Sequence, residues 1–182
     1  MAILDQITIE NANGIYAPRE DSYLMCEAVE KYAKGSVLDL GCGSGILGIA
    51  AAMIGCKVTF ADINRSALIQ SKLNCDLNHT SGAFVLSDMF SSICGKFDTI
   101  LFNPPYVPSE RIDYIDLDGG VGGREVIDRF LLSYKSHINK SGIALLLESS
   151  ANNFDKDVEA YGAEIVLRRH FFFEDLAVLL FK

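Results

Sequence analysis

Three glycines lie in a short loop that follows a largely apolar run in the first third of the chain. The loop reads Asp39-Leu-Gly-Cys-Gly-Ser-Gly45, and an apolar helix is predicted directly after it. Glycines between a strand and a helix let backbone N–H groups approach a bound nucleotide cofactor, although a plain tight connection can use them too. Asp62 ends the next predicted strand, where a carboxylate can accept both hydroxyls of a ribose. The combination favours a cofactor site, and its expected loop residues are Gly41, Cys42, Gly43 and Gly45.

The charge of Asp39 indicates which cofactor fits this loop. A dinucleotide would place a pyrophosphate at the helix N-terminus, where the carboxylate of Asp39 would oppose it. S-adenosylmethionine instead has an ammonium group that can pair with Asp39, and a carboxylate that loop N–H groups can hold. No phosphate-binding loop of the G-x-x-x-x-G-K-[ST] type occurs in the sequence. The sequence therefore predicts S-adenosylmethionine as the cofactor.

A further aspartate, Asp88, follows the third predicted strand in Ser87-Asp-Met-Phe90. Its carboxylate is placed to accept a hydrogen bond from the adenine amino group of the cofactor. The alternative is that Asp88 lies in a surface turn and caps nearby N–H groups. The residues that directly follow Asp62 and Asp88, namely Ile63 and Met89, are included among the expected cofactor contacts.

The loop Asn103-Pro-Pro-Tyr106 follows a predicted strand at the carboxyl edge of the sheet, where ligands of such folds collect. Methyl transfer to a planar nitrogen requires the lone pair of that nitrogen to face the sulfonium methyl group. The side-chain oxygen of Asn103 and the carbonyl of Pro104 can accept the two N–H bonds of an NH₂ group, while Tyr106 offers a flat face for stacking. A rigid strand-ending turn is the alternative interpretation. We expect these three residues to be catalytic, and Asn103 to contact the cofactor as well.

These motifs resemble those of class I S-adenosylmethionine-dependent methyltransferases, and in particular the HemK group, which methylates the glutamine amide of class I release factors. The resemblance covers nearly the whole chain. Tyr16-Ala-Pro-Arg-Glu-Asp-Ser22 is similar to the Y-x-P-x-E-D-[ST] opening of the eukaryotic and archaeal branch, and Gly122-Gly-Arg-Glu-Val-Ile-Asp-Arg129 to its G-R-x-V-x-D-R segment. Asn-Pro-Pro-Tyr alone is shared with adenine N6 and some guanine N2 methyltransferases, so the flanking motifs are more specific. The alternative for the first segment is that Glu20 and Asp21 only place negative charge at a helix N-terminus. The alternative for the second is that Arg124 and Arg129 lie on a solvent-exposed helix face.

The resemblance implies that Tyr16, Pro18 and Ser22 bind the cofactor and that the substrate is a release factor protein. Bacterial members carry a helical substrate-recognition domain before the core, whereas the first predicted strand already begins at Ser36 here. The eukaryotic and archaeal branch uses a small zinc-binding activator subunit that covers an apolar edge. We expect such a partner at the predicted edge strand, Ala83–Leu86.

The elements that must position these residues alternate between strands and helices, which is typical of a parallel sheet covered on both faces. Helices are predicted at Glu20–Lys34, Ile46–Ile54, Ser66–Asn78, Arg124–His137 and Asn153–Ala160. Strands are predicted at Ser36–Leu40, Lys57–Ala61, Ala83–Leu86, Phe97–Phe102, Gly142–Leu147, Glu164–Arg169 and Leu176–Phe181. The last two strands are close enough to form an antiparallel hairpin.

We therefore expect an α/β, Rossmann-like class I methyltransferase fold. Its seven-stranded sheet would be mostly parallel, with an antiparallel last strand and helices on both faces. The prediction is a single methyltransferase domain over residues 1–182, in which residues 1–34 form a loop and a helix and residues 35–182 form the core.

Composition limits the range of partners. The 16 Lys and Arg residues against 24 Asp and Glu residues give a net charge of −8, so autonomous nucleic-acid binding is disfavoured. The longest apolar stretch, Gly45–Gly55, is far shorter than the roughly 20 residues that span a bilayer, so no membrane association is expected. The 5 cysteines have no metal-ligand spacing, which predicts reduced thiols, no metal site and a cytoplasmic location.

Three functions fit these observations. The first is methylation of the glutamine in the Gly-Gly-Gln segment of a release factor. The second is adenine N6 or guanine N2 methylation of RNA or DNA, which the negative charge opposes and a basic partner subunit would favour. The third is a non-catalytic S-adenosylmethionine-binding subunit, which would have no use for the paired acceptors at Asn103.

Overall fold

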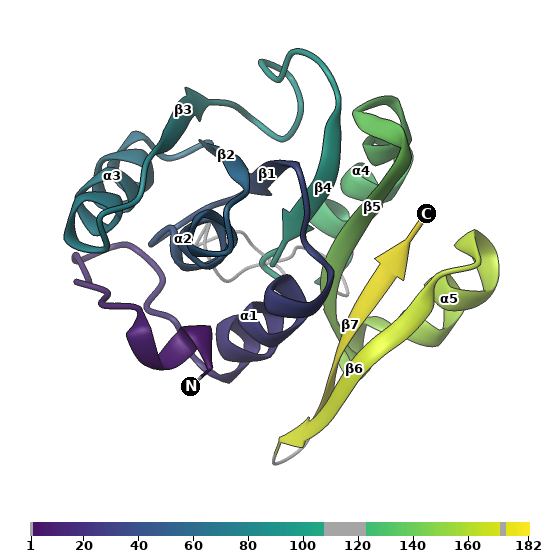
Figure 1. Ribbon diagram of the computed structural model, residues 1–182. Coiled ribbons are helices and arrows are strands. Elements are labelled where there is room, and N and C mark those ends of the chain that lie inside the picture. The colour runs from purple at the N-terminus through teal and green to yellow at the C-terminus, as the bar shows by residue number, and fades with distance from the viewer. Residues whose placement is uncertain (1, 108–122, 172–173) are drawn as a thin grey trace.

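The computed structural model describes residues 2–107, 123–171 and 174–182, and within them seven strands form one sheet (Figure 1). The strands are β1 (Ser36–Leu40), β2 (Lys57–Asp62), β3 (Gly82–Leu86), β4 (Phe97–Phe102), β5 (Ile138–Ser149), β6 (Glu164–Phe171) and β7 (Glu174–Phe181). They lie in the order β3-β2-β1-β4-β5-β7-β6. The first five strands of this order are parallel, whereas β7 is antiparallel to both β5 and β6. The prediction of a mostly parallel sheet with an antiparallel end is confirmed.

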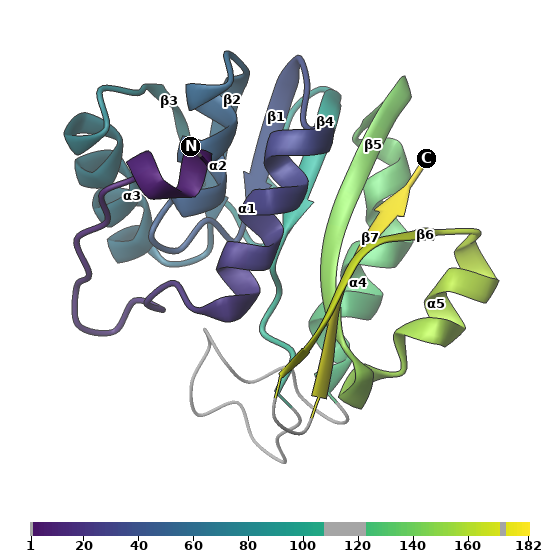
Figure 2. The ribbon, with the colours of Figure 1, turned by 60° about the horizontal axis from the view of Figure 1, so that its bottom comes forward.

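Helices cover both faces of the sheet. They are α1 (Glu20–Tyr32), α2 (Ile46–Met53), α3 (Arg65–Leu77), α4 (Glu125–Ser133) and α5 (Phe154–Tyr161). On one face Leu24 of α1 and Ile49 of α2 join a core with Phe60 of β2, and on the other Ile127 and Phe130 of α4 form a second core. Figure 2 shows α1 in front of the sheet and α4 behind β5. Within the described ranges, no helix combines the length and apolar character that a bilayer crossing requires.

The central strand β1 shows why its sequence is apolar on both sides. Val37 belongs to the core beneath α1 and α2, whereas Leu38 and Leu40 belong to the core beneath α4. All three side chains are buried. Because alternate residues of a strand face opposite sides, a sheet covered on both faces requires a continuous apolar run. Asp39 also lies within this run, so its carboxylate is a buried ionisable group among apolar residues.

Two predicted elements differ from the observed ones by more than two residues at one end, whereas the others agree to within two residues. β5 begins at Ile138 rather than at Gly142, because the Ile138 side chain is buried and the residue already pairs with β4. The helix predicted to reach His137 ends as α4 at Ser133, and a 3₁₀ turn at Tyr134–Ser136 replaces its last turn. Tight turns of this kind are common at helix C-termini.

Side-chain amides of α3 and its C-terminal cap fix the segment that precedes α1. The Thr8 N–H donates to Oδ1 of Asn78 at 2.8 Å, and the Glu10 N–H donates to Oδ1 of Asn74 at 3.0 Å. These bonds satisfy backbone groups that have no strand partner. They hold residues 8–10 against α3.

The five parallel strands end at one edge of the sheet. The glycine loop follows β1 there, residues 87–89 follow β3, and residues 103–106 follow β4. The topology thus gathers at the carboxyl edge three of the segments in which the sequence predicted chemistry.

Candidate active site

Asp39 is a buried carboxylate at the base of the glycine loop. Its side chain is 1% exposed, and its Oδ2 accepts the backbone N–H of Gly48 in α2 at 2.8 Å. Burial raises the pKa of Asp39 to about 8; the hydrogen bond from Gly48 opposes this rise, and the charge of Asp62 adds to it. A buried carboxylate is stabilised in its charged form by a cation, and the ammonium group of S-adenosylmethionine is such a partner.

Asp62 shapes the glycine loop directly. Its Oδ2 accepts the Gly43 N–H at 2.9 Å, and its Oδ1 accepts the Asn64 N–H at 2.8 Å. The carboxylate thereby ties the loop after β1 to the turn after β2. No local sequence pattern indicates these contacts, and the ribose contact of Asp62 stays a prediction.

The glycine loop leaves room for a ligand on its outer side. Gly41, Gly43 and Gly45 all have positive φ, and a Cβ added at Gly43 would meet no other atom within 4 Å. The Cys42 side chain is buried, with its Sγ 3.2 Å from the Ser71 hydroxyl of α3, so only the backbone of this residue faces the loop opening. The N–H groups of Cys42, Gly43 and Gly45 already donate within the protein, so the fit to S-adenosylmethionine rests on the open space and the buried carboxylate.

The two loops that follow β2 and β3 carry the other predicted cofactor contacts. Ile63 is 54% exposed directly after β2, and Met89 has a left-handed φ of 49°. Asp88, next to Met89, forms an ion pair with Arg129 of α4, with 2.7 Å between Oδ1 and Nη2. The adenine acceptor that the sequence predicted therefore already has a cationic partner, which the sequence did not predict.

Asn103 directly follows β4, and its amide is held in one orientation. Nδ2 donates to Oδ2 of Asp21 in α1 at 2.8 Å, whereas Oδ1 is buried and has no hydrogen-bond partner among the described residues. Because a carboxylate only accepts hydrogen bonds from an amide, this contact turns the nitrogen toward α1 and the oxygen away from it. A buried acceptor without a partner is costly, and an N–H group of a substrate would satisfy it.

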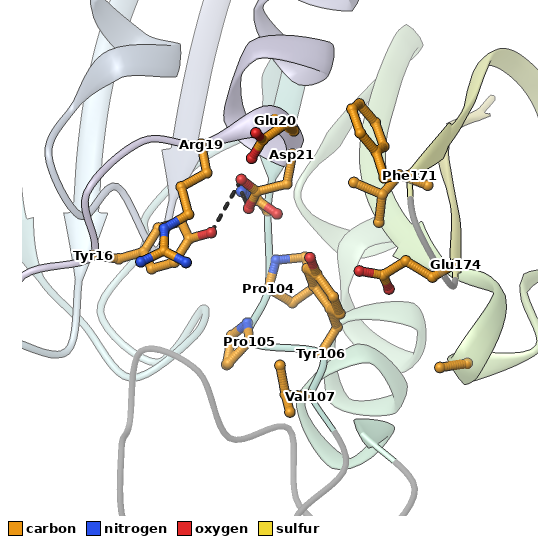
Figure 3. A pocket seen from close by; sticks show the side chains of 13 residues that line it. Tyr16, Arg19, Glu20, Asp21, Pro104, Pro105, Tyr106, Val107, Phe171 and Glu174 are labelled. Carbon is orange, nitrogen blue, oxygen red and sulfur yellow. Dashed lines mark hydrogen bonds between the residues drawn. The ribbon is translucent and has the colours of Figure 1, made fainter.

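Asp21 is the site residue that sequence reasoning missed, although it lies inside the Tyr16–Ser22 motif. It is 4% exposed, and its Oδ1 accepts the Tyr16 hydroxyl at 3.1 Å and the Ser22 hydroxyl at 3.4 Å. Figure 3 shows the Tyr16 ring pointing toward Asp21. Pro18 lies apart from this group and lines a separate cavity of about 330 Å³.

A cavity of about 530 Å³ lies beside Asn103. Figure 3 shows Tyr16 and Arg19 on one side of it, Phe171 and Glu174 on the other, and Pro104 between them. The complete lining is Tyr16, Arg19, Glu20, Asp21, Asn103, Pro104, Pro105, Tyr106, Val107, Ala151, Phe171, Glu174 and Leu176. Apolar and aromatic surface with a few polar groups is typical of a site for a small planar group.

Tyr106 contributes its ring to this cavity as a neutral group. Burial, together with the nearby charge of Asp21, raises the pKa of the Tyr106 hydroxyl well above its usual value. The pKa of Tyr16 is raised in the same direction, again chiefly by burial. Neither phenol therefore ionises at neutral pH, so neither hydroxyl is a candidate general base.

Comparison with known proteins defines the class. Residues 6–154 match the methyltransferase small domain, and the chain belongs to this family. A candidate protein N5-glutamine methyltransferase of Methanocaldococcus jannaschii is 36% identical over 177 residues, which cover 91% of this chain and 90% of that protein. Ribosomal RNA small subunit methyltransferase C of Haemophilus influenzae is 30% identical over 173 residues, which cover 92% of this chain. The same residues cover 47% of that relative, so the chain spans about half of its length.

Solved structures agree with this assignment. The Mtq2 chain of the E. cuniculi Mtq2–Trm112 complex, which is responsible for methylation of the eRF1 translation termination factor, is similar with a TM-score of 0.76 and 30% identity. The match covers 93% of this chain and 98% of that one. The T. thermophilus 16S rRNA N2 G1207 methyltransferase, solved with AdoMet and guanosine, shares the fold with a TM-score of 0.68 at 18% identity, over 96% of this chain and 45% of that one. The protein is an S-adenosylmethionine-dependent methyltransferase with a Rossmann-like fold.

Proposed function

We propose that this protein methylates the side-chain amide nitrogen of the glutamine in the Gly-Gly-Gln segment of a release factor. The observation that carries the proposal is the buried, unpartnered Oδ1 of Asn103 beside the cavity of about 530 Å³. A glutamine amide has two N–H bonds, which Asn103 Oδ1 and the Pro104 carbonyl can accept one each. Both acceptors are needed to fix the plane of the amide, and hence the direction of the nitrogen lone pair.

Each catalytic group has a limited task in this reaction. S-adenosylmethionine supplies an electrophilic methyl group, and Asp39, the glycine loop, Asp62 and Asp88 would hold it. Asn103 and Pro104 would orient the acceptor amide, and the neutral ring of Tyr106 would stack on its plane. The amide nitrogen loses a proton only after the new N–C bond forms, when that proton has become acidic. No general base is required before methyl transfer.

One of the similar proteins supports glutamine as the acceptor, and another supports a termination factor as the substrate. The M. jannaschii relative is a candidate N5-glutamine methyltransferase, and the E. cuniculi complex methylates a termination factor. The cysteines are all free of disulfides, which agrees with a cytoplasmic location of the enzyme and its substrate.

A nucleic-acid substrate is the second candidate function, because ribosomal RNA methyltransferases are also among the relatives. Charge opposes this candidate. Glu20, Asp21 and Glu174 line the cavity beside Asn103, against the single guanidinium of Arg19, and the chain carries a net charge of −8. A phosphate backbone would meet repulsion at this opening.

The decisive experiment locates the methyl group. The protein, with its small partner subunit, is incubated with labelled S-adenosylmethionine and separately with release factor, ribosomal RNA and DNA. We expect label only in the release factor, on the glutamine of Gly-Gly-Gln by mass spectrometry, and none in a substrate with leucine at that position. Label in RNA instead would support the second candidate and overturn the first.

A matched pair of variants tests the proposed role of Asn103. Asn103→Ala should reduce turnover by on the order of 100-fold or more, because it removes an orienting acceptor, while cofactor affinity stays within a few-fold. Asn139 supplies the control, since its amide also donates to an aspartate, Asp98, at 2.7 Å, but at the opposite edge of the sheet. Full turnover of Asn103→Ala would show that the loop is only a turn.

The proposal includes a small zinc-binding activator subunit bound at β3. Among the described residues β3 ends the strand order and pairs with β2 alone, so one side of its backbone is open to strand addition. Beside it, Ile69, Leu73 and Leu77 of α3 are 57%, 51% and 43% exposed at a spacing of four residues, which puts them on one helix face. An apolar stripe next to an open edge is suited to a partner chain. The structure of the E. cuniculi complex with Trm112 supports such a subunit.

The partner surface has its own matched test. Leu73→Asp places a charge at the centre of the exposed stripe and should abolish stimulation by the subunit without unfolding the domain. Leu132→Asp is the control, because Leu132 is 82% exposed on α4, which covers the other face of the sheet. Loss of stimulation in both variants, or in neither, would contradict the proposed surface.

A further inference from the structure

The last carbonyl of the Asn-Pro-Pro-Tyr loop is held by a side chain from a distant part of the chain. Nδ2 of Asn152, just beyond β5, donates to the Tyr106 carbonyl at 2.9 Å and to the Gly123 carbonyl at 3.3 Å. Oδ1 of Asn152 accepts the Ser149 N–H at 3.2 Å, so both ends of this amide are engaged and its orientation is fixed. The Asn152 side chain is 2% exposed. One buried amide therefore joins the loop after β4 to the start of α4.

The backbone around Asn152 is fixed in turn by Arg124. Nη1 of Arg124 donates to the Asn152 carbonyl at 3.0 Å. The same guanidinium pairs with Asp157 of α5 at 2.5 Å and with Glu148 of β5 at 3.3 Å. Both carboxyl groups are buried, and burial together with the charge of Asp157 raises the pKa of Glu148 to about 9. Asp157 therefore carries the buried charge that Arg124 balances, and removing the partner of a buried charge is strongly destabilising. The network thus resists displacement of Asn152.

Gly123 shows how closely the two segments approach. A Cβ at this position would lie 2.1 Å from the Tyr106 carbonyl oxygen and 2.4 Å from Nδ2 of Asn152. Only glycine leaves space for this approach, and its φ of +69° is also in the region that favours glycine. The Gly122–Arg129 segment identified in the sequence therefore has a packing role at Gly123 and Arg124, while Gly122 lies outside the described residues.

We propose that Asn152 is a positioning residue for methyl transfer. It holds the C-terminal end of the Asn-Pro-Pro-Tyr loop, so that the ring of Tyr106 and the carboxamide oxygen of Asn103 keep their places at the cavity. Arg124 acts one step further away, through the backbone of Asn152. The inference rests on the proposed function of the loop, and it assigns to Asn152 and Arg124 an effect on the rate of transfer rather than on cofactor binding.

The test compares two asparagines with the same bonding pattern. Asn78 also accepts one backbone N–H, that of Thr8 at 2.8 Å, and donates Nδ2 to two carbonyls, those of Thr8 and Asn74, both at 2.7 Å. In either residue a change to Asp keeps the acceptor, removes the donor and places a carboxylate against two carbonyls. Both variants are measured with saturating partner subunit, labelled S-adenosylmethionine and release factor, and their stability is measured by urea unfolding.

For Asn152→Asp we expect kcat to fall roughly tenfold or more with the affinity for S-adenosylmethionine within about twofold of the native protein. Asn78→Asp, at a more exposed position, should lose less stability and keep kcat within about twofold. Arg124→Lys, which keeps the positive charge but not the planar fork, should give a smaller fall in kcat of the same kind, and it serves if Asn152→Asp does not fold. Equal kcat values in Asn152→Asp and Asn78→Asp, or native kcat in Arg124→Lys, would overturn the inference.

Asn103→Ala, measured in parallel, separates this inference from the proposed function. If Asn103→Ala keeps full turnover, the function proposed for the loop is wrong. If Asn103→Ala loses turnover while Asn152→Asp behaves like Asn78→Asp, the function stands and only the positioning role is wrong.

Discussion

Replacing Asp21 by alanine removes the group that orients the Asn103 amide. In the native protein Oδ2 of Asp21 accepts Nδ2 of Asn103 at 2.8 Å, and this contact decides which way the amide faces. Without it, the two amide orientations become similar in energy, and the oxygen no longer faces the cavity preferentially. We therefore expect Asp21→Ala to lower turnover even though Asp21 itself is not assigned a contact with the acceptor nitrogen.

The size of the effect follows from the strength of that hydrogen bond. A hydrogen bond to a charged group contributes roughly 1.5–3 kcal/mol, and about 1.4 kcal/mol corresponds to a factor of ten in rate. If all of this energy serves to orient the amide, kcat falls roughly 10- to 100-fold. Asp21→Ala also removes the acceptor of the Tyr16 hydroxyl, which lies 3.1 Å from Oδ1. Tyr16→Phe is the control, because it removes that second bond alone.

A double-mutant cycle provides the assay. Methylation of release factor is measured for Asp21→Ala, for Asn103→Ala and for the variant with both changes, with cofactor affinity determined by calorimetry. If Asp21 acts only through Asn103, its replacement should have little further effect once Asn103 is alanine. Additive losses in the double variant, or a tenfold loss in Tyr16→Phe alone, would refute the orienting role.

Two further predictions concern the cofactor site. Because the pKa of Asp39 is raised to about 8, its carboxyl is protonated in the free protein at lower pH, and cofactor binding must release that proton. The affinity for S-adenosylmethionine by calorimetry should therefore fall roughly tenfold for each pH unit below about 8, and Asp39→Asn should remove this dependence. Asp62→Ala should weaken cofactor binding by roughly 1.5–3 kcal/mol. It should also lower the midpoint of thermal unfolding, because the Gly43 and Asn64 N–H groups lose their acceptor.

The sequence predicted the strands better than the helix ends, and burial explains the difference. β1 and β4 begin and end at the predicted residues, because each is an apolar run with both faces covered and polar residues or glycine beyond it. The end of α4 was wrong because its apolar pattern continues through Tyr134, which is fully buried in a 3₁₀ turn. A buried side chain at this position is compatible both with a further turn of α-helix and with a 3₁₀ turn, so burial alone does not predict which of them forms.

For the site, the sequence identified segments but not the contacts between them. The glycine loop, residues 87–89 and residues 103–106 all follow strand ends at the carboxyl edge, and the sequence could predict this because strand ends and glycines are local features. The pairing of Arg129 with Asp88 spans 41 residues and depends on how α4 packs beside the loop after β3. Asp21 is the α1 carboxylate that accepts from Asn103, and no local pattern distinguishes it from the preceding Glu20 in this respect.

The two prolines of the Asn-Pro-Pro-Tyr loop explain why such distant partners are needed. Proline fixes its own φ but has no N–H, so the loop cannot hold itself through the backbone donors that close an ordinary turn. The groups that do hold it come from 82 residues before it, where Asp21 accepts from Asn103, and from 46 residues after it, where Asn152 donates to Tyr106. The motif supplies rigid acceptors, and within the part of the chain that the structure describes these tertiary contacts place them. Proteins that share Asn-Pro-Pro-Tyr can therefore share its chemistry and still differ in substrate, because the residues that orient the loop lie outside the motif.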